Sequence, residues 1–380
     1  MKKKKVIIAP DSFKESLTAL EVAEAMENGF KKIFPDWEYI KVPMADGGEG
    51  TVQSLVDALD GSMKEVDVLD PLGKKIRASY GLSGDGKQAI IEMATASGLE
   101  LIKPSDRKVM QATSWGLGDL ILDALDEEVE KILIGIGGSA TNDAGSGMIQ
   151  SLGGKLLDAD GKQIPHGGEA LSKLQSIDLS ELDARLKDVK IEVACDVTNP
   201  LTGLDGASHV YGPQKGADEK QVEQLDSNLK HFAKMIRKDL DIDIENEPGA
   251  GAAGGVGGAL LAFLGAELRG GGELITEWLD LEEALKDADL VITGEGGINH
   301  QTIYGKTPVV VGKLAKKHQI PVIALVGSIS EGYEGVYDIG IDAVFSIISE
   351  VADLEETLEA GFSNVEQTAE NVARTLKLKI

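Results

Sequence analysis

The stretch Val6-Ile7-Ile8-Ala9-Pro10-Asp11 is a short apolar run that ends in a polar turn, and the residues after it repeat the arrangement. Residues 16–34 place apolar side chains at helical spacing, residues 39–43 form a second apolar run, and residues 51–59 carry a second helical pattern. Strands that alternate with helices are typical of a parallel sheet covered by helices. The sequence therefore predicts an α/β fold.

This alternation stops near residue 64 and returns near residue 288. Between residues 64 and 92, short strand-like segments are separated by Pro-Leu-Gly and Gly-Asp-Gly, which favour antiparallel hairpins. After the return, three further strands are predicted, at residues 290–293, 322–326 and 343–346.

The length of 380 residues exceeds what one hydrophobic core supports, so we expect two domains. We expect residues 1–63 and 285–380 to form one discontinuous α/β domain built from both chain ends. Residues 64–284 then form an inserted mixed α/β domain, with residues 108–153 packing on either domain.

The composition restricts the class of partner. The net charge is −26 and the pI is near 4.6, so the chain repels polyanions and we expect neither nucleic acid nor an anionic membrane as a partner. The single cysteine, Cys195, excludes an intramolecular disulfide and fits a reducing compartment. No apolar run approaches the roughly 20 residues of a membrane-spanning helix. We expect a cytoplasmic protein that binds small molecules, whose oligomeric state the sequence does not fix.

Four segments that follow predicted strands combine glycine with polar side chains, at residues 10–14, 44–51, 135–143 and 293–297. In open α/β sheets, ligands bind at the carboxyl ends of the strands. Turn formation or helix capping would explain any one segment alone, but four together favour a binding site. Glycine amides at helix starts suit phosphate, and carboxylates suit Mg²⁺. The candidate carboxylates are Asp11, Asp46, Asp196 and Glu295.

Generic nucleotide-binding motifs give weaker signals. The segment Gly81–Lys87 matches a P-loop up to its lysine, but Gln88 replaces Ser or Thr, which predicts a hairpin turn instead. The segment Gly135-Ile136-Gly137-Gly138-Ser139-Ala140 fits a dinucleotide fingerprint, with Asp158 about 20 residues further on. An NAD-dependent dehydrogenase is therefore an alternative, although Thr141-Asn142-Asp143 adds polar side chains that pyrophosphate binding does not require.

The same residues carry a resemblance along nearly the whole chain: the sequence is similar to the class I glycerate kinase family. The matching blocks are Ala9–Lys14, Pro43–Thr51, Gly135–Asp143, Ala194–Leu201, Gly212–Ala217, Pro248–Gly255, and Thr293–Gly296 with Gln301-Thr302 and Gly305-Lys306. The resemblance implies a flavodoxin-like parallel-sheet domain from both chain ends and an inserted mixed α/β domain. It also implies phosphorylation of D-glycerate by ATP, with Mg²⁺, to 2-phosphoglycerate, or to 3-phosphoglycerate as the alternative product.

Phosphoryl transfer requires positioning, charge neutralisation and a weak base on the accepting hydroxyl. We assign Asp196 as base or magnesium ligand and Glu295 as a second metal ligand. Lys14 and Lys306 are expected to neutralise phosphate or carboxylate, because a net-acidic protein must supply positive charge locally. The predicted catalytic residues are Asp196, Lys14 and Asn199. The predicted substrate- and nucleotide-binding residues are Asp11, Ser12, Asp46, Gly137, Gly138, Ser139, Thr141, Asn142, Gln214, Lys215, Glu295, Gln301 and Lys306.

The sequence departs from the family pattern after Thr-Gly-Glu-Gly. The family usually continues with arginine, an aliphatic residue and aspartate, whereas Gly297, Ile298 and Asn299 stand here. A lost charged hydrogen bond costs on the order of 1.5–3 kcal/mol, so a catalytically weakened glycerate-binding sensor is a second alternative. Glu15 and Ala144, where glycine is common, are expected to affect packing only.

Overall fold

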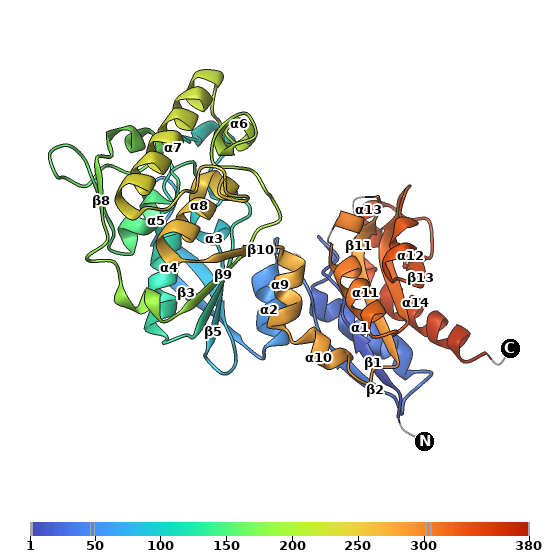
Figure 1. The fold of residues 1–380 in the computed structure, drawn as a ribbon. Helices are drawn as coiled ribbons and strands as arrows, with labels where there is room; N and C mark the ends of the chain where they lie inside the picture. The colour runs from blue at the N-terminus through green and yellow to red at the C-terminus, as the bar shows by residue number, and fades with distance from the viewer. Residues whose placement is uncertain (1–2, 46, 49, 301, 305, 379–380) are drawn as a thin grey trace. The chain divides into compact units, whose positions relative to one another are not determined.

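The computed structural model describes residues 3–45, 47–48, 50–300, 302–304 and 306–378. The chain divides into two compact units: unit 1 contains residues 1–60 and 271–380, and unit 2 contains residues 61–270 (Figure 1). Unit 1 has a parallel sheet from both chain ends and unit 2 has a mixed sheet, so the predicted α/β fold class is confirmed. No helix within the described ranges is long and apolar enough to cross a membrane.

The sheet of unit 1 has the order β13-β12-β11-β1-β2, and every neighbouring pair is parallel. Its strands are β1 (Lys5–Ile8), β2 (Glu38–Lys41), β11 (Leu290–Ile298), β12 (Val322–Ile329) and β13 (Ala343–Ser346). Numbered along the chain within this unit, the order is 2-1-3-4-5, which is the flavodoxin-like arrangement. The implied flavodoxin-like sheet is therefore present.

Helices flank this sheet. They are α1 (Ala19–Lys31), α2 (Thr51–Ala58), α9 (Gly271–Trp278), α10 (Leu281–Leu285), α11 (Thr307–Lys317), α12 (Gly335–Ile339), α13 (Leu354–Glu359) and α14 (Gly361–Leu376), with the 3₁₀ turn η6 (Thr302–Tyr304). Helix α1 begins with a capping box, in which Thr18 and Glu21 satisfy each other's backbone N–H groups. Its buried face shares one apolar core with α14 and the sheet, including Met26, Phe30 and Val365.

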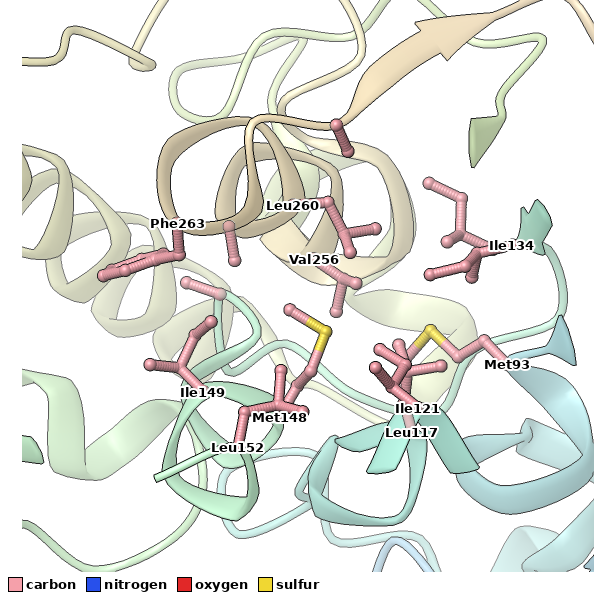
Figure 2. Packing of buried hydrophobic residues seen from close by; sticks show 14 of the residues in the cluster. Met93, Leu117, Ile121, Ile134, Met148, Ile149, Leu152, Val256, Leu260 and Phe263 are labelled. Atoms are coloured by element: carbon pink, nitrogen blue, oxygen red, sulfur yellow. The ribbon is translucent and has the colours of Figure 1, made fainter. Parts of the chain in front are cut away.

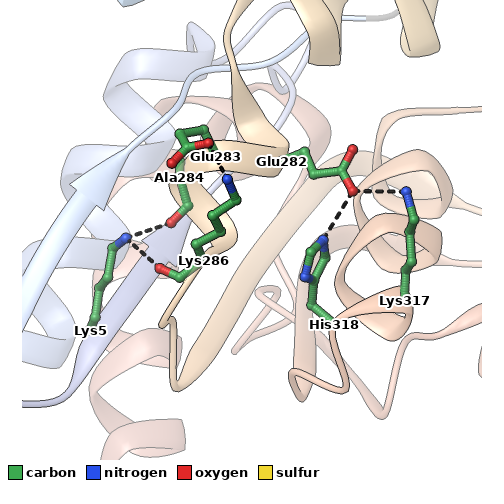
Figure 3. A network of polar contacts seen from close by, with 7 residues as sticks. All are labelled: Lys5, Glu282, Glu283, Ala284, Lys286, Lys317 and His318. Atoms are coloured by element: carbon green, nitrogen blue, oxygen red, sulfur yellow. Dashed lines mark hydrogen bonds and ion pairs between the residues drawn. The ribbon is translucent and has the colours of Figure 1, made fainter.

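The chain returns from unit 2 to unit 1 after residue 270, whereas the sequence predicted this return at residue 285. Helices α9 and α10 therefore belong to unit 1. Figure 3 shows part of the reason. The Lys5 ammonium of β1 donates to the carbonyls of Ala284 (2.6 Å) and Lys286 (3.0 Å) at the end of α10. On the same helix, Glu282 pairs with Lys317 at 2.8 Å. These polar contacts join distant segments of the chain, so no local sequence pattern reports them.

The sheet of unit 2 has the order β10-β9-β6-β5-β4-β3. Its strands are β3 (Ser62–Leu69), β4 (Lys75–Leu82), β5 (Gln88–Glu92), β6 (Lys131–Gly135), β9 (Lys190–Ala194) and β10 (Glu267–Arg269); β7 (Lys155–Leu157) and β8 (Ser176–Asp178) form a separate pair. Strands β3, β4 and β5 are antiparallel, and β5, β6, β9 and β10 are parallel. The P-loop-like segment is the β4–β5 turn, as the sequence predicted.

The helices of unit 2 contribute buried side chains to one apolar core. They are α3 (Ala94–Ser97), α4 (Trp115–Asp126), α5 (Ser146–Ser151), α6 (Ala207–Tyr211), α7 (Glu219–Leu240) and α8 (Ala252–Leu264), with 3₁₀ turns η1 (Leu99–Leu101), η2 (Pro104–Asp106), η3 (Gly168–Lys173), η4 (Ala184–Lys187) and η5 (Pro213–Lys215). Figure 2 shows Val256 and Leu260 of α8 beside Met148 of α5 and Ile121 of α4 in this core. Residues 108–153 lie within unit 2.

Candidate functional site

Strands β1 and β11 of unit 1 are neighbours, yet the chain leaves them in opposite directions across the sheet. After β1 it passes through α1 to β2, and after β11 it passes through α11 to β12. Such a topological switch point opens a crevice at the carboxyl ends of the two strands, where ligands bind in open α/β sheets. Asp11 follows β1, and Glu295 lies on the carboxyl-terminal half of β11.

The Asp11 carboxylate is held in place at this switch point. Its Oδ1 accepts a hydrogen bond from the Ser12 backbone N–H at 2.7 Å, and its Oδ2 accepts one from the Thr307 hydroxyl at 2.6 Å. The Asp11 backbone N–H donates to the carbonyl of Gly294 at 2.9 Å. Thr307 is the first residue of α11, so one carboxylate connects the end of β1 to the start of α11.

The Glu295 carboxylate is buried beside Asp11. Its Oε1 accepts from the Thr302 hydroxyl at 2.9 Å, and its Oε2 lies 3.4 Å from the Lys306 ammonium. Burial raises the pKa of Glu295, the neighbouring Asp11 adds to this, and Lys306 and Thr302 oppose it. Two carboxylates and one ammonium therefore share the switch point, together with two threonine hydroxyls.

The segment after residue 293 is a strand and not the glycine-rich loop expected from the sequence. Strand β11 continues to Ile298, with Gly297 opposite Ser328 and Ile298 opposite Ile329 of β12. Glycine is required at Gly294, because a Cβ there would lie 2.1 Å from the carbonyl oxygen of Leu325. The glycines permit close strand pairing, so Glu295 projects from a rigid strand.

The remaining predicted residues of unit 1 differ in exposure. Lys14 is exposed on the turn after β1, and Lys306 is partly exposed at the amino end of α11. Asp46 and Gln301, both predicted to bind substrate or nucleotide, lie outside the residues that the structure describes.

Four parallel strands of unit 2 end in register along one edge of its sheet. Gly135 of β6 is paired with Glu92 of β5 and Ala194 of β9, and Arg269 of β10 is paired with Ala194. The glycine-rich segment 137–143 follows β6, and Asp196 follows β9. The sheet therefore brings the predicted residues of this unit to its carboxyl edge.

The segment 137–143, which we call the glycine loop, exposes only its first residues. Gly137 and Gly138 are exposed and Ser139 is nearly buried, while Thr141 and Asn142 have no exposed surface. The Asn142 amide exchanges hydrogen bonds with Ser208. Thr141 and Asn142 were predicted to hold the anion by backbone and hydroxyl donors, and this stays a prediction; in the structure both side chains are buried.

Asp143, the last residue of the loop, and Lys215 carry charged groups on the buried side of the loop. The buried Asp143 carboxylate accepts from the Ser114 hydroxyl and from three backbone N–H groups, those of Ser114, Gly145 and Gly147. Desolvation raises its pKa, and these hydrogen bonds oppose the rise. The Lys215 ammonium donates to the Ser139 hydroxyl at 2.9 Å and to the Thr141 carbonyl at 2.6 Å. Lys215 is only 2% exposed, so it contacts the loop from its inner side.

The predicted catalytic residues Asp196 and Asn199 lie on the loop after β9, and the predicted binding residue Gln214 lies in η5. Asp196 is exposed, and a Cβ on Gly270 would lie 3.6 Å from its Oδ1. Both ends of the Asn199 amide are engaged locally: Oδ1 accepts from the Tyr211 hydroxyl at 2.7 Å, and Nδ2 donates to the Asp205 carbonyl at 2.8 Å. Gln214 is exposed. Asn199 therefore shapes the 199–211 segment, whereas Asp196 faces solvent.

Several residues that shape the two sites were not among the predicted site residues. They are Thr302 and Thr307 in unit 1 and Ser114, Asp143, Ser208 and Tyr211 in unit 2. Thr302 lies in the matching block Gln301-Thr302, Asp143 ends the block Gly135–Asp143, and Thr307 directly follows Lys306, so the position in these blocks was the available signal. Within the described ranges, no group of three or more His, Cys, Asp and Glu side chains is arranged to hold a metal ion.

The dinucleotide fingerprint does not have the required surroundings. Asp158 lies in a turn after β7, where its carboxylate accepts from the backbone N–H groups of Asp160 and Lys162. Strand β7 pairs with β8 and not with β6, so Asp158 does not end a strand beside the fingerprint strand. The dehydrogenase alternative therefore lacks its ribose-binding carboxylate.

Comparison with known proteins agrees with the resemblance in the sequence. The profile of the Glycerate kinase family matches residues 6–377. The chain is 53% identical to Glycerate 2-kinase of Escherichia coli (strain K12), over 98% of each chain. It is 55% identical to Glycerate kinase of Haemophilus influenzae (strain ATCC 51907 / DSM 11121 / KW20 / Rd), over 99% of each chain.

A solved structure gives the same result. A crystal structure from Salmonella typhimurium LT2, whose assignment as glycerate kinase 2 is provisional, superposes with a TM-score of 0.92 at 55% identity. The match covers 99% of this chain and 98% of that one. With sequence and fold matched over almost the full length, the chain belongs to the glycerate kinase family.

Proposed function

We propose that this chain transfers the γ-phosphoryl group of ATP to a hydroxyl group of D-glycerate, forming 2-phosphoglycerate. The observation that carries the proposal is the identity of 53–55%, over nearly the full length, to bacterial proteins named glycerate kinase or glycerate 2-kinase. The name of the Escherichia coli relative favours phosphorylation at position 2. We propose the cytosol as the compartment, where ATP is available and a single free cysteine stays reduced.

In unit 1, we propose that the switch point holds Mg²⁺ and phosphate. Mg²⁺ is usually bound by one or two carboxylates together with substrate phosphates, and Asp11 and Glu295 provide such a donor set. When bound, the ion would neutralise negative charge on the phosphates. Lys306, 3.4 Å from Glu295, and the exposed Lys14 would add positive charge for the same phosphates. Ser12 is next to Asp11 and can donate its hydroxyl to phosphate oxygen.

In unit 2, we propose that the glycine loop binds an anionic group through the backbone amides of Gly137, Gly138 and Ser139. No donation from these three N–H groups occurs within the part of the chain that the structure describes, which leaves them available for a ligand. Asp196, exposed at the same edge of the sheet, would accept the proton of the attacking hydroxyl. The exposed Gln214 would orient the substrate, and Asn199 would keep its loop in shape.

A coupled assay of ADP release with D-glycerate, ATP and Mg²⁺ tests this function. We expect glycerate-dependent turnover, with ³¹P NMR assigning the phosphate to O2; a product phosphorylated at O3 would correct the regiochemistry. Asp196→Asn should lower kcat by about 100-fold or more, because general-base catalysis contributes roughly 10²–10⁴. Binding of glycerate in calorimetry without ADP release would instead establish the sensor alternative, and NAD binding without ADP release would favour a dehydrogenase.

A further inference from the structure

The glycine loop presents backbone N–H donors that have no partner among the described residues, and it is held by backbone contacts on two flanks and by Lys215 on its inner side. Leu99 donates to the Gly138 carbonyl at 2.8 Å and Ala140 donates to the Ser97 carbonyl at 2.9 Å, so neighbouring backbone fixes the loop on one flank. At the opposite end of the loop, the N–H of the next residue, Ala144, donates to the Gly254 carbonyl at 3.0 Å. The third contact is Lys215, the cation that underlies the loop.

The position of Lys215 is energetically unusual for a lysine. Lysine is almost never fully buried unless it is paired, and an ammonium in a protein interior favours loss of its proton. Burial lowers the pKa of Lys215 to about 7, and the charge of Asp143 opposes that shift. A hydrophobic residue of similar length would be accommodated at lower cost, so the charge itself is the feature that calls for a function.

The contacts of Lys215 connect this charge to the exposed donors. Because its ammonium donates to the Ser139 oxygen, the hydroxyl proton of Ser139 points away from Lys215. Its donation to the Thr141 carbonyl fixes the next peptide of the loop. The charged groups that surround this arrangement are Asp143 on the loop and Arg107, which donates to the carbonyl of Gln214, the residue before Lys215.

We propose that Lys215 is a positioning residue that sets the affinity of the glycine loop for an anionic substrate group without touching that group. The ammonium fixes Ser139 and Thr141 and adds positive potential beneath the amides of Gly137 and Gly138. This inference deepens the proposed function and rests on it. The bound group is a carboxylate or a phosphate, from glycerate or from ATP.

The same geometry couples anion binding to a proton. A pKa near 7 leaves much of Lys215 neutral at pH 8 in the ligand-free protein. A bound anion stabilises the ammonium form, so binding is accompanied by proton uptake and weakens as the pH rises above 7. A purely structural lysine would not give this pH dependence.

The test compares Lys215→Met with the wild type and with Lys220→Met, which removes an exposed lysine of α7. Michaelis constants for glycerate and for ATP are measured separately between pH 6 and pH 9, and thermal melting reports folding. We expect Lys215→Met to raise one of the two constants at least tenfold at pH 7, to change kcat less than threefold, and to remove the pH dependence of that constant. Lys220→Met should match the wild type. The substrate affected identifies the source of the anion.

Ser139→Ala provides the second variant, because it retains the charge and removes one of its two contacts. We expect a smaller rise in the same Michaelis constant, with its pH dependence retained. The inference is overturned if Lys215→Met leaves both constants within twofold of the wild type, or if it lowers kcat while both constants stay unchanged. If Lys215→Met does not fold, the Ser139→Ala profile decides: a constant that does not depend on pH overturns the inference.

Failure of the proposed function would look different. If the wild type releases no ADP with glycerate, the same variants are titrated by calorimetry with D-glycerate and with inorganic phosphate, in buffers of different ionisation enthalpy. Proton uptake by the wild type that is absent in Lys215→Met supports the inference independently of turnover. Equal affinity and equal proton uptake in both proteins overturns it.

Discussion

The Thr307 hydroxyl donates to the Asp11 carboxylate at 2.6 Å, and this bond joins residues 296 positions apart in the sequence. It connects the turn after β1 to the first residue of α11, on the two sides of the switch point. The Asp11 oxygen that accepts it is thereby fixed in direction. The Ser12 backbone N–H holds the other carboxylate oxygen at 2.7 Å, so the two bonds together orient the Asp11 side chain.

Removal of this hydroxyl should therefore affect ligand binding more than folding. Hydrogen bonds to charged groups contribute roughly 1.5–3 kcal/mol, so Thr307→Val should raise the Michaelis constant for ATP by about tenfold. Thr307→Ser retains the hydroxyl and should restore most of the affinity. Steady-state kinetics of the three proteins with ATP as the varied substrate measures this. Equal constants for the Val and Ser variants would contradict a role for the bond.

The buried Glu295 should make stability and activity respond to pH in opposite directions. Its raised pKa means that the native state retains a proton that the unfolded chain has already lost. This contribution to stability is complete below the unfolded pKa and is lost as the pH rises through the native pKa. Glu295→Gln cannot ionise and does not lose this contribution. As the pH is raised from 4 to 8, the melting temperature of Glu295→Gln should therefore rise relative to that of the wild type.

Activity should follow the ionised carboxylate. If the Glu295 carboxylate helps to hold Mg²⁺ as proposed, kcat/KM of the wild type falls as the pH drops through the raised pKa of Glu295. Glu295→Gln is then inactive at every pH tested. The exposed Glu331→Gln serves as the matched control and should melt and turn over like the wild type. A Glu295→Gln variant that retains activity would exclude Glu295 from the reaction.

Ala144 occupies a backbone conformation that suits glycine. Its φ of 52° lies in the left-handed region, as does the φ of 64° at Glu15. At both positions the family commonly has glycine. The replacement of glycine by Glu15 and Ala144 therefore introduces backbone strain, in addition to the effect on packing that was expected from the sequence.

Relief of this strain should stabilise unit 2. The left-handed conformation costs a residue with a Cβ roughly 1–2 kcal/mol, and the greater freedom of glycine in the unfolded chain offsets part of the gain. We expect Ala144→Gly to raise the free energy of unfolding by about 0.5–1 kcal/mol in chemical denaturation. Ala140→Gly, at a buried loop position with ordinary φ, should lower it. The same sign for both variants would contradict the explanation.

Gly297 and Asn299 stand where the family usually has arginine and aspartate. A Cβ on Gly297 would lie 2.9 Å from the Ser328 hydroxyl oxygen, but Ser328 is exposed and its side chain can rotate. We expect Gly297→Arg with Asn299→Asp to fold, and to lower the Michaelis constant of one substrate by about tenfold if the added arginine contacts an anion. Addition of Ser328→Ala should raise the melting temperature of that variant. Unchanged kinetics would show that the family's arginine is dispensable here.

Much of the fold followed from local patterns. The apolar run at residues 6–9 and the helical spacing after it correctly predicted β1 and α1, and the turn chemistry near residues 84–86 correctly predicted the β4–β5 hairpin. Residues 293–297 were predicted as a loop that follows a strand at residues 290–293, because they combine small residues with polar ones. They form the end of β11, since the close backbone of β12 leaves no room for a Cβ at Gly294. That neighbour is 31 residues away, so no local pattern records it.

The sequence predicted only part of the candidate site, again because local patterns do not record contacts between distant segments. Sequence patterns identified the glycine loop and the carboxylates Asp11 and Glu295, because small and acidic residues after strands are visible locally. They did not distinguish Gly137, which is exposed, from Thr141, which is buried in the same loop. That difference depends on the segment around Gly254, where a Cβ would lie 2.0 Å from the Thr141 carbonyl oxygen.

By itself, the sequence determined the α/β class, the discontinuous parallel-sheet domain and the family, because periodicity and ordered motifs are properties of the chain. The tertiary structure alone decided that Asp11 is fixed by Thr307, that α10 joins unit 1, and that Lys215 lies beneath the glycine loop. Each of these depends on burial and hydrogen bonding between segments far apart in the sequence, from 35 positions for Glu282 and Lys317 to 296 for Asp11 and Thr307. Such contacts exist only once the sheets have placed the ends of their strands side by side.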